Sequence, residues 1–381
     1  MRRAELPSPD PQALAASRAL LERIGAELGA AGNWVSFARY MELALYEPGL
    51  GYYASGARKL GAGGDFVTAP ELSPLFGRTL ARQIAQVLGP DDAVLEFGAG
   101  SGALAETLLG ELSCPYFILE TSPELRERQQ RRLGGRTRWL ERLPERFRGV
   151  MLANEVADAM PVHALAWMRD GVLERGVCAN EGTGKEHTRV LAWSDRPAAG
   201  SVLIAAKEID IEIPPSGRYE SELALVARAW MRSLGRFLER GAILVIDYGF
   251  PAREYFHPQR SMGTLACHYR HHVHDDPFYL PGLQDVTAHV DFSALARAAA
   301  DAGLDVLGYA NQARFLVNCG ITDLLAEENP ADPKRYLPAA AAAQKLLSPS
   351  EMGELFKVLA VGRGVSKPLL GFSSGDRSHA L

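Results

Sequence analysis

The sequence predicts an α/β fold with a mostly parallel sheet, a helical N-terminal extension and an inserted β-rich subdomain. Between residues 93 and 153, apolar strand-like runs alternate with helical stretches, a pattern typical of parallel strands joined by right-handed crossovers. The first of these strands leads directly into glycines at alternate positions, Gly98, Gly100 and Gly102. Glycines between a strand and a helix let the backbone turn tightly and bring N–H groups against a bound nucleotide.

Residues 1–92 are expected to form a helical extension with a loop that covers a cofactor. Leucine and isoleucine recur at helical spacing over residues 14–28, and residues 37–46 have the pattern of a second helix. The stretch 49–70 is rich in glycine and aromatic residues, which suits either a packed connector or a lid. A further helix is expected to begin at Pro70.

The α/β core is expected in two parts, residues 93–161 and 219–365. The first part is predicted to contain a strand at 93–97, a helix at 103–112, a strand at 116–120, a helix at 123–133, a weak strand at 136–140 and a strand at 149–153. The second part is predicted to contain a helix at 223–237, a buried strand at 242–247, a helix at 293–302 capped by Asp291, strands at 306–309 and 355–361, and an alanine-rich helix at 338–346. The arginines at 126–132 are interpreted as the solvated face of their helix.

Two stretches interrupt the core. Residues 162–218 are interpreted as the inserted β-rich subdomain, because they contain short strand-like runs at 162–168, 172–178, 190–193 and 201–205. Residues 248–286 form a second, irregular insertion. The last residues, 366–381, are expected to be a flexible tail.

Composition and charge exclude several classes of protein. With 381 residues, 47% of them hydrophobic, the chain can bury one large core or two modest ones. The formal charge of −5 provides no excess of cations for a phosphate backbone, so no nucleic-acid partner is expected. The 4 cysteines lack a Cys-x-x-Cys pair, which suits free thiols in a reducing compartment. No apolar run approaches the roughly 20 residues that span a bilayer, and no signal peptide is recognised, so we expect a cytoplasmic protein without membrane insertion.

The identity of the nucleotide depends on the residues around the glycines. Glu120 ends the next strand about 20 residues after Gly98, which is the position from which a carboxylate accepts hydrogen bonds from a ribose diol. NAD and S-adenosylmethionine (SAM) both satisfy this arrangement. The spacing Gly98-x-Gly100-x-x-Ala103 even fits the dinucleotide pattern.

Three observations favour SAM. Glu96 lies just before the first glycine, where it can orient the loop or meet the cationic amino acid end of SAM but would repel a pyrophosphate. The glycines follow a long N-terminal stretch that includes a loop able to close over a ligand. The strand at 149–153 is followed by Asn154 and Glu155, polar residues at the carboxyl edge of the sheet, where ligands bind in open α/β folds.

Beyond these single residues, the chain resembles the MidA family of SAM-dependent methyltransferases, whose mitochondrial members act in respiratory complex I assembly as protein arginine methyltransferases. The resemblance covers about residues 35–362, and its blocks are 40–46 with 51–53, 64–71 with 75–77, 96–102, 120–123, 153–155 with 158–162, 246–249, 274–277 and 287–292. One departure is visible, because Cys267 and His268 precede Tyr269 and Arg270 where family members often carry glutamine.

The resemblance implies a class I, Rossmann-like methyltransferase fold, with SAM as cofactor and S-adenosylhomocysteine as product. It implies that SAM is held by the three alternate glycines and Glu120, with the loop from Gly64 to Glu71 at the cofactor. The expected cofactor-binding residues are Gly64, Phe66, Thr68, Glu96, Gly98, Gly100, Gly102, Glu120, Thr121 and Asn154. The expected partner is a protein substrate, with a complex I subunit as one option, and a homodimer is a further option.

The implied chemistry needs carboxylates that grip a guanidinium through paired hydrogen bonds and align one nitrogen with the methyl group. Glu155 and Asp158 are the expected catalytic residues, because on a turn or helix start their side chains can face one cavity. The alternative for Asp158 is a local cap or salt bridge. An enzyme that methylates DNA or a glutamine amide would instead carry an Asn/Asp-Pro-Pro-aromatic turn, whereas Asn154 is followed by glutamate.

Other functions stay open at the level of sequence. The chain could be a non-catalytic SAM-binding assembly factor that holds a partner with its two irregular regions, or an NAD-dependent oxidoreductase. No metal is expected, because methyl transfer needs none and the spacing of the clustered histidines matches no helix-borne pair of ligands; these histidines are His268, His271, His272 and His274. His289 is expected to brace the loop before Asp291 rather than to act as a base.

Overall fold

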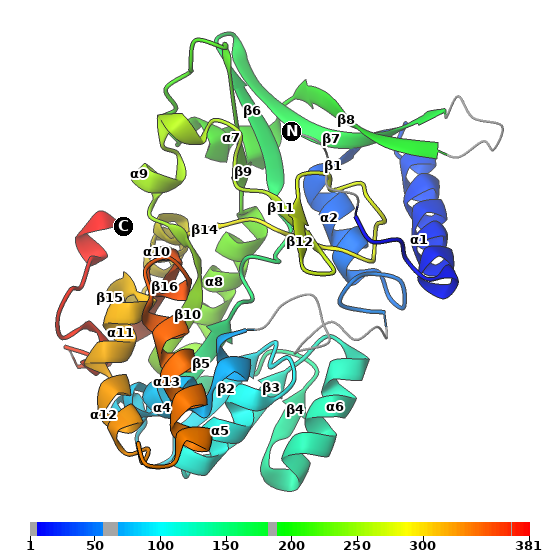
Figure 1. Ribbon diagram of the computed structural model, residues 1–381. Coiled ribbons are helices and arrows are strands. Elements are labelled where there is room, and N and C mark those ends of the chain that lie inside the picture. Colours follow the sequence, from blue (N-terminus) through cyan, green and yellow to red (C-terminus); the bar gives the residue numbers. More distant parts are fainter. Residues whose placement is uncertain (1–5, 56–67, 182–188, 367) are drawn as a thin grey trace. The chain divides into compact units, whose positions relative to one another are not determined.

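The computed structural model describes residues 6–55, 68–181, 189–366 and 368–381, and the chain folds into two compact units (Figure 1). Unit 1 comprises residues 1–57, 159–227 and 253–289, and unit 2 comprises residues 58–158, 228–252 and 290–381. Each unit is therefore assembled from segments that are far apart in the sequence. The first part of the N-terminal extension shares unit 1 with most of the two stretches that interrupt the core, residues 162–218 and 248–286. The glycine loop, residues 98–102, belongs to unit 2.

Unit 2 is built on a mostly parallel sheet with the strand order β15-β16-β10-β5-β2-β3-β4. Its strands are β2 (Ala93–Phe97), β3 (Tyr116–Leu119), β4 (Arg138–Leu140), β5 (Phe147–Asn154), β10 (Leu238–Phe250), β15 (Asp305–Asn311) and β16 (Phe356–Arg363), and the short β14 (Val290–Asp291) pairs with β10. The run from β10 to β4 is parallel, whereas β16 is antiparallel to both of its neighbours. The chain order reverses between β2 and β5, and ligands of open α/β sheets bind at the carboxyl ends of strands at such a point.

Helices pack on both faces of this sheet. Val94 of β2 belongs to one apolar cluster with Leu104 and Leu108, whereas Phe97, on the opposite face of the same strand, contacts Trp230 with ring centroids 5.5 Å apart. The helices of unit 2 are α3 (Ala69–Leu72), α4 (Pro74–Val87), α5 (Ala103–Glu111), α6 (Pro123–Leu133), α10 (Phe292–Asp301), α11 (Gln312–Asn318), α12 (Ile321–Ala326), α13 (Pro333–Leu347) and α14 (Met352–Leu355), and α8 (Leu225–Phe237) spans the boundary of the units.

The helix expected to begin at Pro70 is in fact two helices, α3 and α4. Ser73 lies between them in an extended conformation, and its hydroxyl caps α4 by accepting a hydrogen bond from the Leu75 amide at 3.2 Å. Pro74 follows at the first position of α4, where a missing N–H costs nothing. A serine followed by proline therefore ends one helix and starts the next.

Unit 1 contains a second sheet, whose strands β8 (Arg189–Pro197), β7 (Gly171–Glu181), β6 (His163–Met168) and β9 (Arg218–Leu223) pair antiparallel in this order. The short β1 (Val35–Ser36) also pairs with β7. Helices α1 (Pro11–Ala30) and α2 (Phe37–Tyr46) share an apolar core with the sheet. Unit 1 also holds α7 (Gly200–Lys207), most of α9 (Ala252–Tyr255) and a smaller sheet of β11 (Ala266–Tyr269), β12 (His272–His274) and β13 (Asp285–Thr287).

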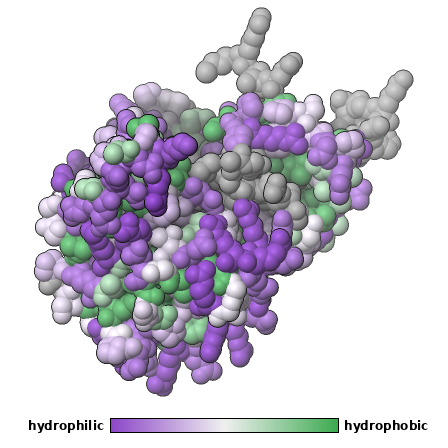
Figure 2. All heavy atoms as spheres, turned by 60° about the horizontal axis from the view of Figure 1, so that its bottom comes forward, coloured by the Kyte–Doolittle hydropathy of each residue, from purple (hydrophilic) through white to green (hydrophobic). Residues whose placement is uncertain are grey.

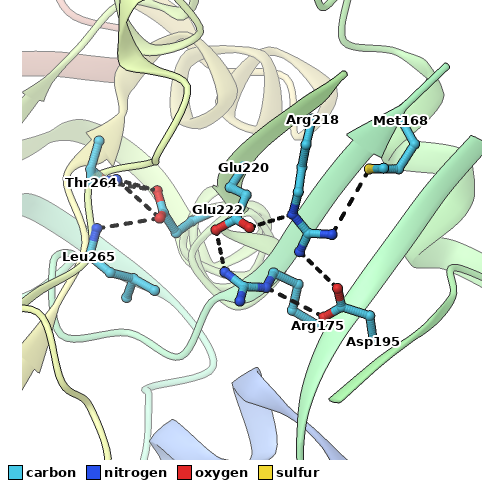
Figure 3. A network of polar contacts seen from close by, with 8 residues as sticks. All are labelled: Met168, Arg175, Asp195, Arg218, Glu220, Glu222, Thr264 and Leu265. Atoms are coloured by element: carbon cyan, nitrogen blue, oxygen red, sulfur yellow. Dashed lines mark hydrogen bonds and ion pairs between the residues drawn. The ribbon is translucent and has the colours of Figure 1, made fainter. Parts of the chain in front are cut away.

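One face of the unit 1 sheet carries a closed ring of charges (Figure 3). Arg218 lies 2.5 Å from Glu220 and 2.7 Å from Asp195. Arg175 contacts the same two carboxylates, with 3.4 Å to Asp195. These side chains meet across β6 because that strand carries alanines opposite Arg175 and Glu220. The ring therefore ties β7, β8 and β9 together.

Two segments differ from the expectations. Residues 201–205, expected to be a strand, lie in helix α7, because a short apolar run does not by itself distinguish strand from helix. Residues 366–381 were expected to be a flexible tail, but Leu369 and Phe372 are buried and the Arg377 amide donates to the carbonyl of Tyr309 at 2.6 Å. The end of the chain is therefore packed onto β15.

The surface is largely hydrophilic where Figure 2 shows it, with smaller apolar patches in between. On α6, whose arginines were interpreted as a solvated face, Arg132 lies 2.7 Å from Glu106 and Arg131 lies 3.6 Å from Glu127. Such mixed charges are usual for a solvated helix. Among the described helices, none combines the length and the apolar character needed to cross a membrane.

Candidate functional site

The glycine loop follows β2 at the carboxyl edge of the unit 2 sheet. Gly98, Gly100 and Gly102 have φ angles of 57°, 54° and 81°, in the left-handed region that glycine adopts without a steric penalty. Gly102 is the N-cap of α5 and has no side chain that would satisfy the first amides of this helix. The loop and the first turn of α5 therefore present backbone N–H groups, which is the arrangement that binds negatively charged or hydrogen-bonding ligands.

Hydrogen bonds hold this loop from within and from neighbouring elements. The Gly98 amide donates to the carbonyl of Leu119 at 3.0 Å, and the Gly102 amide donates to the carbonyl of Ala99 at 2.8 Å. The Ser101 hydroxyl contacts the carboxylate of Glu71, which lies in α3. The loop is therefore fixed before any ligand arrives.

Glu120 follows β3, as expected for a carboxylate that binds a ribose. Its Oε1 accepts a hydrogen bond from the Ser122 amide and its Oε2 accepts one from Gln129 Nε2, both at 2.9 Å. Burial raises the pKa of Glu120. Each carboxylate oxygen has a second lone pair, so both oxygens can still accept from a diol. Thr121, which was expected to contribute to the same site, is exposed.

Gln129 is a buried residue of this region that the sequence reasoning missed. Its Nε2 donates to the carbonyl of Gly100 as well as to Glu120, and its Oε1 accepts from Trp139 Nε1, each at 2.9 Å. It lies in α6, within a charged run that gives no sign of a binding role. The only available signal is an uncharged polar residue on the apolar side of a helix that was interpreted as solvated.

The environment of Glu96 differs from that of Glu120. Its side chain is 3% exposed, and its Oε2 accepts a hydrogen bond from the Tyr116 hydroxyl at 2.6 Å. Burial, and then the charge of Glu120, raise the pKa of Glu96 to about 7. This contact ties β2 to β3 below the loop. A direct contact of Glu96 with the ammonium group of a ligand stays a prediction.

A turn follows β5 and begins at Glu155. Glu155 has φ of 55°, which is uncommon for a residue with a side chain, and its amide donates to the carbonyl of Ile246 at 2.9 Å. Its Oε1 accepts from Asn154 Nδ2 at 3.1 Å and from the Ala69 amide at 3.4 Å. Because Glu155 Oε1 is the acceptor in both contacts, the NH₂ group of Asn154 faces Glu155 and its Oδ1 is left as an acceptor. That oxygen is buried and has no hydrogen-bond partner among the described residues.

Asp158 completes the turn. Its Oδ2 accepts a hydrogen bond from the hydroxyl of Tyr248, in β10, at 2.6 Å. The neighbouring Asp247 accepts three backbone amides of the turn on its Oδ2, from Val156, Ala157 and Asp158 at 3.2, 2.9 and 3.2 Å. The sequence reasoning did not identify Asp247 or Tyr248 as part of the site.

The carboxylates of this turn influence one another. Burial and then the charge of Asp158 raise the pKa of Glu155 to about 8. Burial, followed by the charges of Asp158 and Glu155, also raises the pKa of Asp247. A cation that enters such a site is stabilised by each ionised carboxylate it meets, and its charge favours their ionisation.

The turn and the glycine loop are adjacent. A Cβ atom placed on Gly98 would lie 3.3 Å from Cγ2 of Val156. The parallel pairing of β2 with β5 brings their carboxyl ends together, so Phe97 lies opposite Ala153. The glycine loop with Glu120 fits an adenosyl ligand, and the orphaned Oδ1 of Asn154 offers an acceptor beside it. Unit 2 thus brings together the glycine loop and the turn of residues 155–158, which we call the acidic turn.

Only some of the remaining expected residues belong to the part of the chain that the structure describes. Gly64 and Phe66 lie outside the described residues. Thr68 is partly buried at the start of α3, and its hydroxyl does not cap that helix. In unit 1, the clustered histidines lie on and around the β11–β12 hairpin, and no group of three metal-ligating side chains occurs in the described part of the chain. The His289 amide donates to Thr264 Oγ1 at 3.1 Å.

Comparisons with known proteins agree with this geometry. A family model of S-adenosyl-L-methionine-dependent methyltransferases matches residues 75–310. The chain is 30% identical to the mitochondrial protein arginine methyltransferase NDUFAF7 of Danio rerio, over 91% of this chain and 87% of that protein, and 29% identical to the human protein of the same name, over 86% and 80%. A crystal structure from Burkholderia thailandensis, bound to S-adenosyl-homocysteine, is 50% identical with a TM-score of 0.93 and covers 99% of this chain and 100% of that chain.

Proposed function

Because the chain belongs to the family of S-adenosyl-L-methionine-dependent methyltransferases, we propose that it transfers the methyl group to an arginine side chain of a protein. Its cofactor is SAM. The acceptor is inferred from the acidic turn next to the glycine loop and from the names of the curated relatives. Glu155 and Asp158 are the proposed catalytic residues, and the glycine loop with Glu120 is the proposed site of SAM.

The observation that carries the proposal is the pair of acidic side chains at the carboxyl end of β5. Glu155 and Asp158 lie on one turn, close enough for the charge of Asp158 to raise the pKa of Glu155. The first glycine of the loop lies against Val156, one of the two residues between them. A guanidinium is planar and carries N–H donors on three sides, so it suits a site that offers several acceptors at once.

The chain's own residues would perform three tasks: bind the guanidinium, align one of its nitrogens with the methyl group, and accept the proton that this nitrogen loses. Bound SAM supplies an electrophilic methyl group on a positively charged sulfur. Glu155 and Asp158 accept N–H bonds of the guanidinium and hold one nitrogen in line with the methyl group, and such alignment can supply roughly 7–11 kcal/mol of the barrier. When that nitrogen gains a methyl group it must lose a proton, which the ionised Glu155 can accept.

The protein substrate is proposed to be a subunit of respiratory complex I or a similar protein, as the resemblance implies. A cytoplasmic location is supported by the free state of the cysteines, two of which are buried, because free thiols suit a reducing compartment.

The expected homodimer is tested by light scattering, where a mass of twice 41.4 kDa would support it. The alternative of a non-catalytic assembly factor predicts SAM binding without any methyl transfer.

The experiment uses purified protein, tritiated SAM and extract from cells that lack this protein. Labelled protein is hydrolysed and the labelled amino acid is identified. We expect methyl-arginine, and we expect Glu155→Gln to lower labelling by about 100-fold or more while calorimetry with S-adenosylhomocysteine still shows binding. Replacement of the exposed Glu145 by glutamine is the matched control. Label on lysine or glutamine, or full activity of Glu155→Gln, would rule the proposal out.

A further inference from the structure

We propose that Asp247 and Tyr248, neighbours in β10, are positioning residues for the acidic turn: Asp247 holds the backbone of the turn, and Tyr248 holds the carboxylate of Asp158. This inference rests on the proposed roles of Glu155 and Asp158. It concerns how the two side chains are kept in one arrangement before a substrate binds, since neither Asp247 nor Tyr248 needs to touch the substrate.

Asp247 is fully buried, with 0% of its surface exposed. A buried carboxylate is costly unless hydrogen bonds compensate for the lost water. Asp247 meets this condition with backbone amides alone, because its Oδ2 accepts from three consecutive residues of the turn and its Oδ1 accepts from the Tyr248 amide at 2.9 Å. The turn that starts at Glu155 is neither helix nor strand, so the regular hydrogen bonds of a helix or a sheet do not satisfy these amides. One carboxylate therefore replaces the hydrogen bonds that regular structure would give the turn.

The backbone of Glu155 shows what this arrangement achieves. Its φ of 55° is uncommon for a residue other than glycine, and such a conformation persists where the surroundings determine it. The Glu155 amide is held by Ile246, and the next three amides are held by Asp247. Two successive residues of β10 thus fix the point at which β5 ends and the direction in which the Glu155 side chain leaves the backbone.

Tyr248 fixes the second carboxylate. Its hydroxyl donates to Asp158 Oδ2 at 2.6 Å, which is a short hydrogen bond to a charged acceptor. Its ring packs edge-on against Phe356, with centroids 5.6 Å apart and planes at 76°. The ring is therefore held by packing, and a phenylalanine at this position would keep the packing while it removes the hydrogen bond.

The expected consequence is a defect in catalysis rather than in cofactor binding. Displacement of a catalytic group by about 1 Å can cost roughly 100-fold in rate. The glycine loop and Glu120 have hydrogen-bond partners of their own in β3, α3 and α6, so these parts of the proposed SAM site are held without Asp247 or Tyr248. We therefore expect kcat to fall by about 10- to 100-fold in Asp247→Asn and in Tyr248→Phe, with the Kd for S-adenosylhomocysteine within about 2-fold of the original value.

The controls are matched in chemistry. Asp291→Asn changes another buried aspartate of unit 2, which accepts the Ala294 amide at 2.9 Å at the start of α10. Tyr255→Phe removes another tyrosine hydroxyl that donates to a buried carboxylate, Glu222, at 3.2 Å. Both controls are expected to change stability without a selective change in kcat.

Amide hydrogen exchange gives a readout that does not depend on activity. An asparagine offers one acceptor oxygen where Asp247 offers two, so Asp247→Asn cannot hold both the turn and the Tyr248 amide. We expect at least 10-fold faster exchange in Asp247→Asn, either at Val156, Ala157 and Asp158 or at Tyr248, and no such change at these amides in Asp291→Asn. Unchanged exchange at these amides would overturn the role of Asp247, and normal kcat in Tyr248→Phe would overturn the role of Tyr248. Absence of arginine methylation by the unmodified protein would instead refute the proposed function and leave the exchange result to decide this inference.

Discussion

Gln129 and Glu120 are joined by a hydrogen bond of 2.9 Å, and the same Nε2 group of Gln129 also donates to the carbonyl of Gly100 at 2.9 Å. One buried amide thus links the glycine loop to the carboxylate that is proposed to bind the ribose. Since α6 supplies Gln129 and the two partners follow β2 and β3, the two halves of the proposed SAM site are held at a fixed spacing.

Gln129→Leu is expected to weaken binding of S-adenosylhomocysteine. The variant removes a charge-assisted hydrogen bond to Glu120, worth roughly 1.5–3 kcal/mol, so affinity should fall by about 10- to 100-fold in calorimetry. Gln312→Leu is the control, because Gln312 is equally buried but donates to the carbonyl of Leu346, in α13. If both variants bind as the original protein does, Gln129 has no part in the cofactor site.

Gly98→Ala is expected to abolish most binding of the cofactor. Its φ of 57° strains any residue with a Cβ, and that Cβ would lie 3.3 Å from the Val156 side chain. Gly134→Ala also places a Cβ at a positive φ, here with φ of 59° and ψ of −141°, but with nothing within 4 Å. Both substitutions should lower stability in urea unfolding, by roughly 1–2 kcal/mol or more, but only Gly98→Ala should also reduce affinity for S-adenosylhomocysteine. Equal affinity in the two variants would contradict a loop that contacts the cofactor.

Methyl transfer is expected to become faster as the pH rises toward about 8. The pKa of Glu155 is raised to about 8, so below this pH the free enzyme carries a protonated Glu155, which cannot accept a proton. The acceptor guanidinium stays charged throughout this range and adds no titration of its own. The measurement is kcat/KM from pH 6 to 9.5, and the control is Glu155→Gln, whose residual activity should lack this step. A flat profile in the original protein would exclude Glu155 as the base.

The same group predicts how stability depends on pH. Because the folded state holds the Glu155 proton more tightly than the unfolded state, this residue contributes stability that is fully present below its unfolded pKa of about 4.5 and is lost as the pH rises through about 8. The side chain of Glu155→Gln cannot titrate. The free energy of unfolding of this variant should therefore increase relative to that of the original protein as the pH rises from about 4.5 to above 8. Urea unfolding at pH 5 and pH 9 measures the difference, and a constant difference would argue against a raised pKa.

Glu222→Gln is expected to destabilise unit 1. The carboxylate of Glu222 is buried and accepts hydrogen bonds from the Thr264 amide at 3.0 Å, the Thr264 hydroxyl at 2.8 Å and the Leu265 amide at 3.3 Å (Figure 3). A glutamine would turn an NH₂ group toward some of these donors, at a cost of about 2–4 kcal/mol. Urea unfolding measures this loss, with the exposed Glu239→Gln expected to change stability by less than about 0.5 kcal/mol. A loss as small as that of the control would show that the carboxylate is dispensable.

Local sequence patterns predicted much of the fold. Strand β2 and helix α6 have the bounds expected from the sequence, since a buried apolar run before glycines and a Ser-Pro start are strong local signals. The class I methyltransferase fold is confirmed by the likeness to the Burkholderia thailandensis structure. The strand expected at residues 201–205 was wrong because its residues are compatible with either helix or strand, and the neighbouring chain makes the choice.

Local spacing in the sequence predicted three chemical features: a glycine loop between a strand and a helix, a carboxylate at the end of the next strand, and acidic residues after β5. Backbone geometry over a few residues sets these features, so they can be recognised without the rest of the chain. The link that Gln129 makes between the loop and Glu120, and the contacts of Asp247 and Tyr248 with the acidic turn, became visible in the folded chain. Those contacts join residues of separate elements, and in the case of Asp247 residues about 90 positions apart in the chain, which only the pairing of β5 with β10 brings within reach of one another.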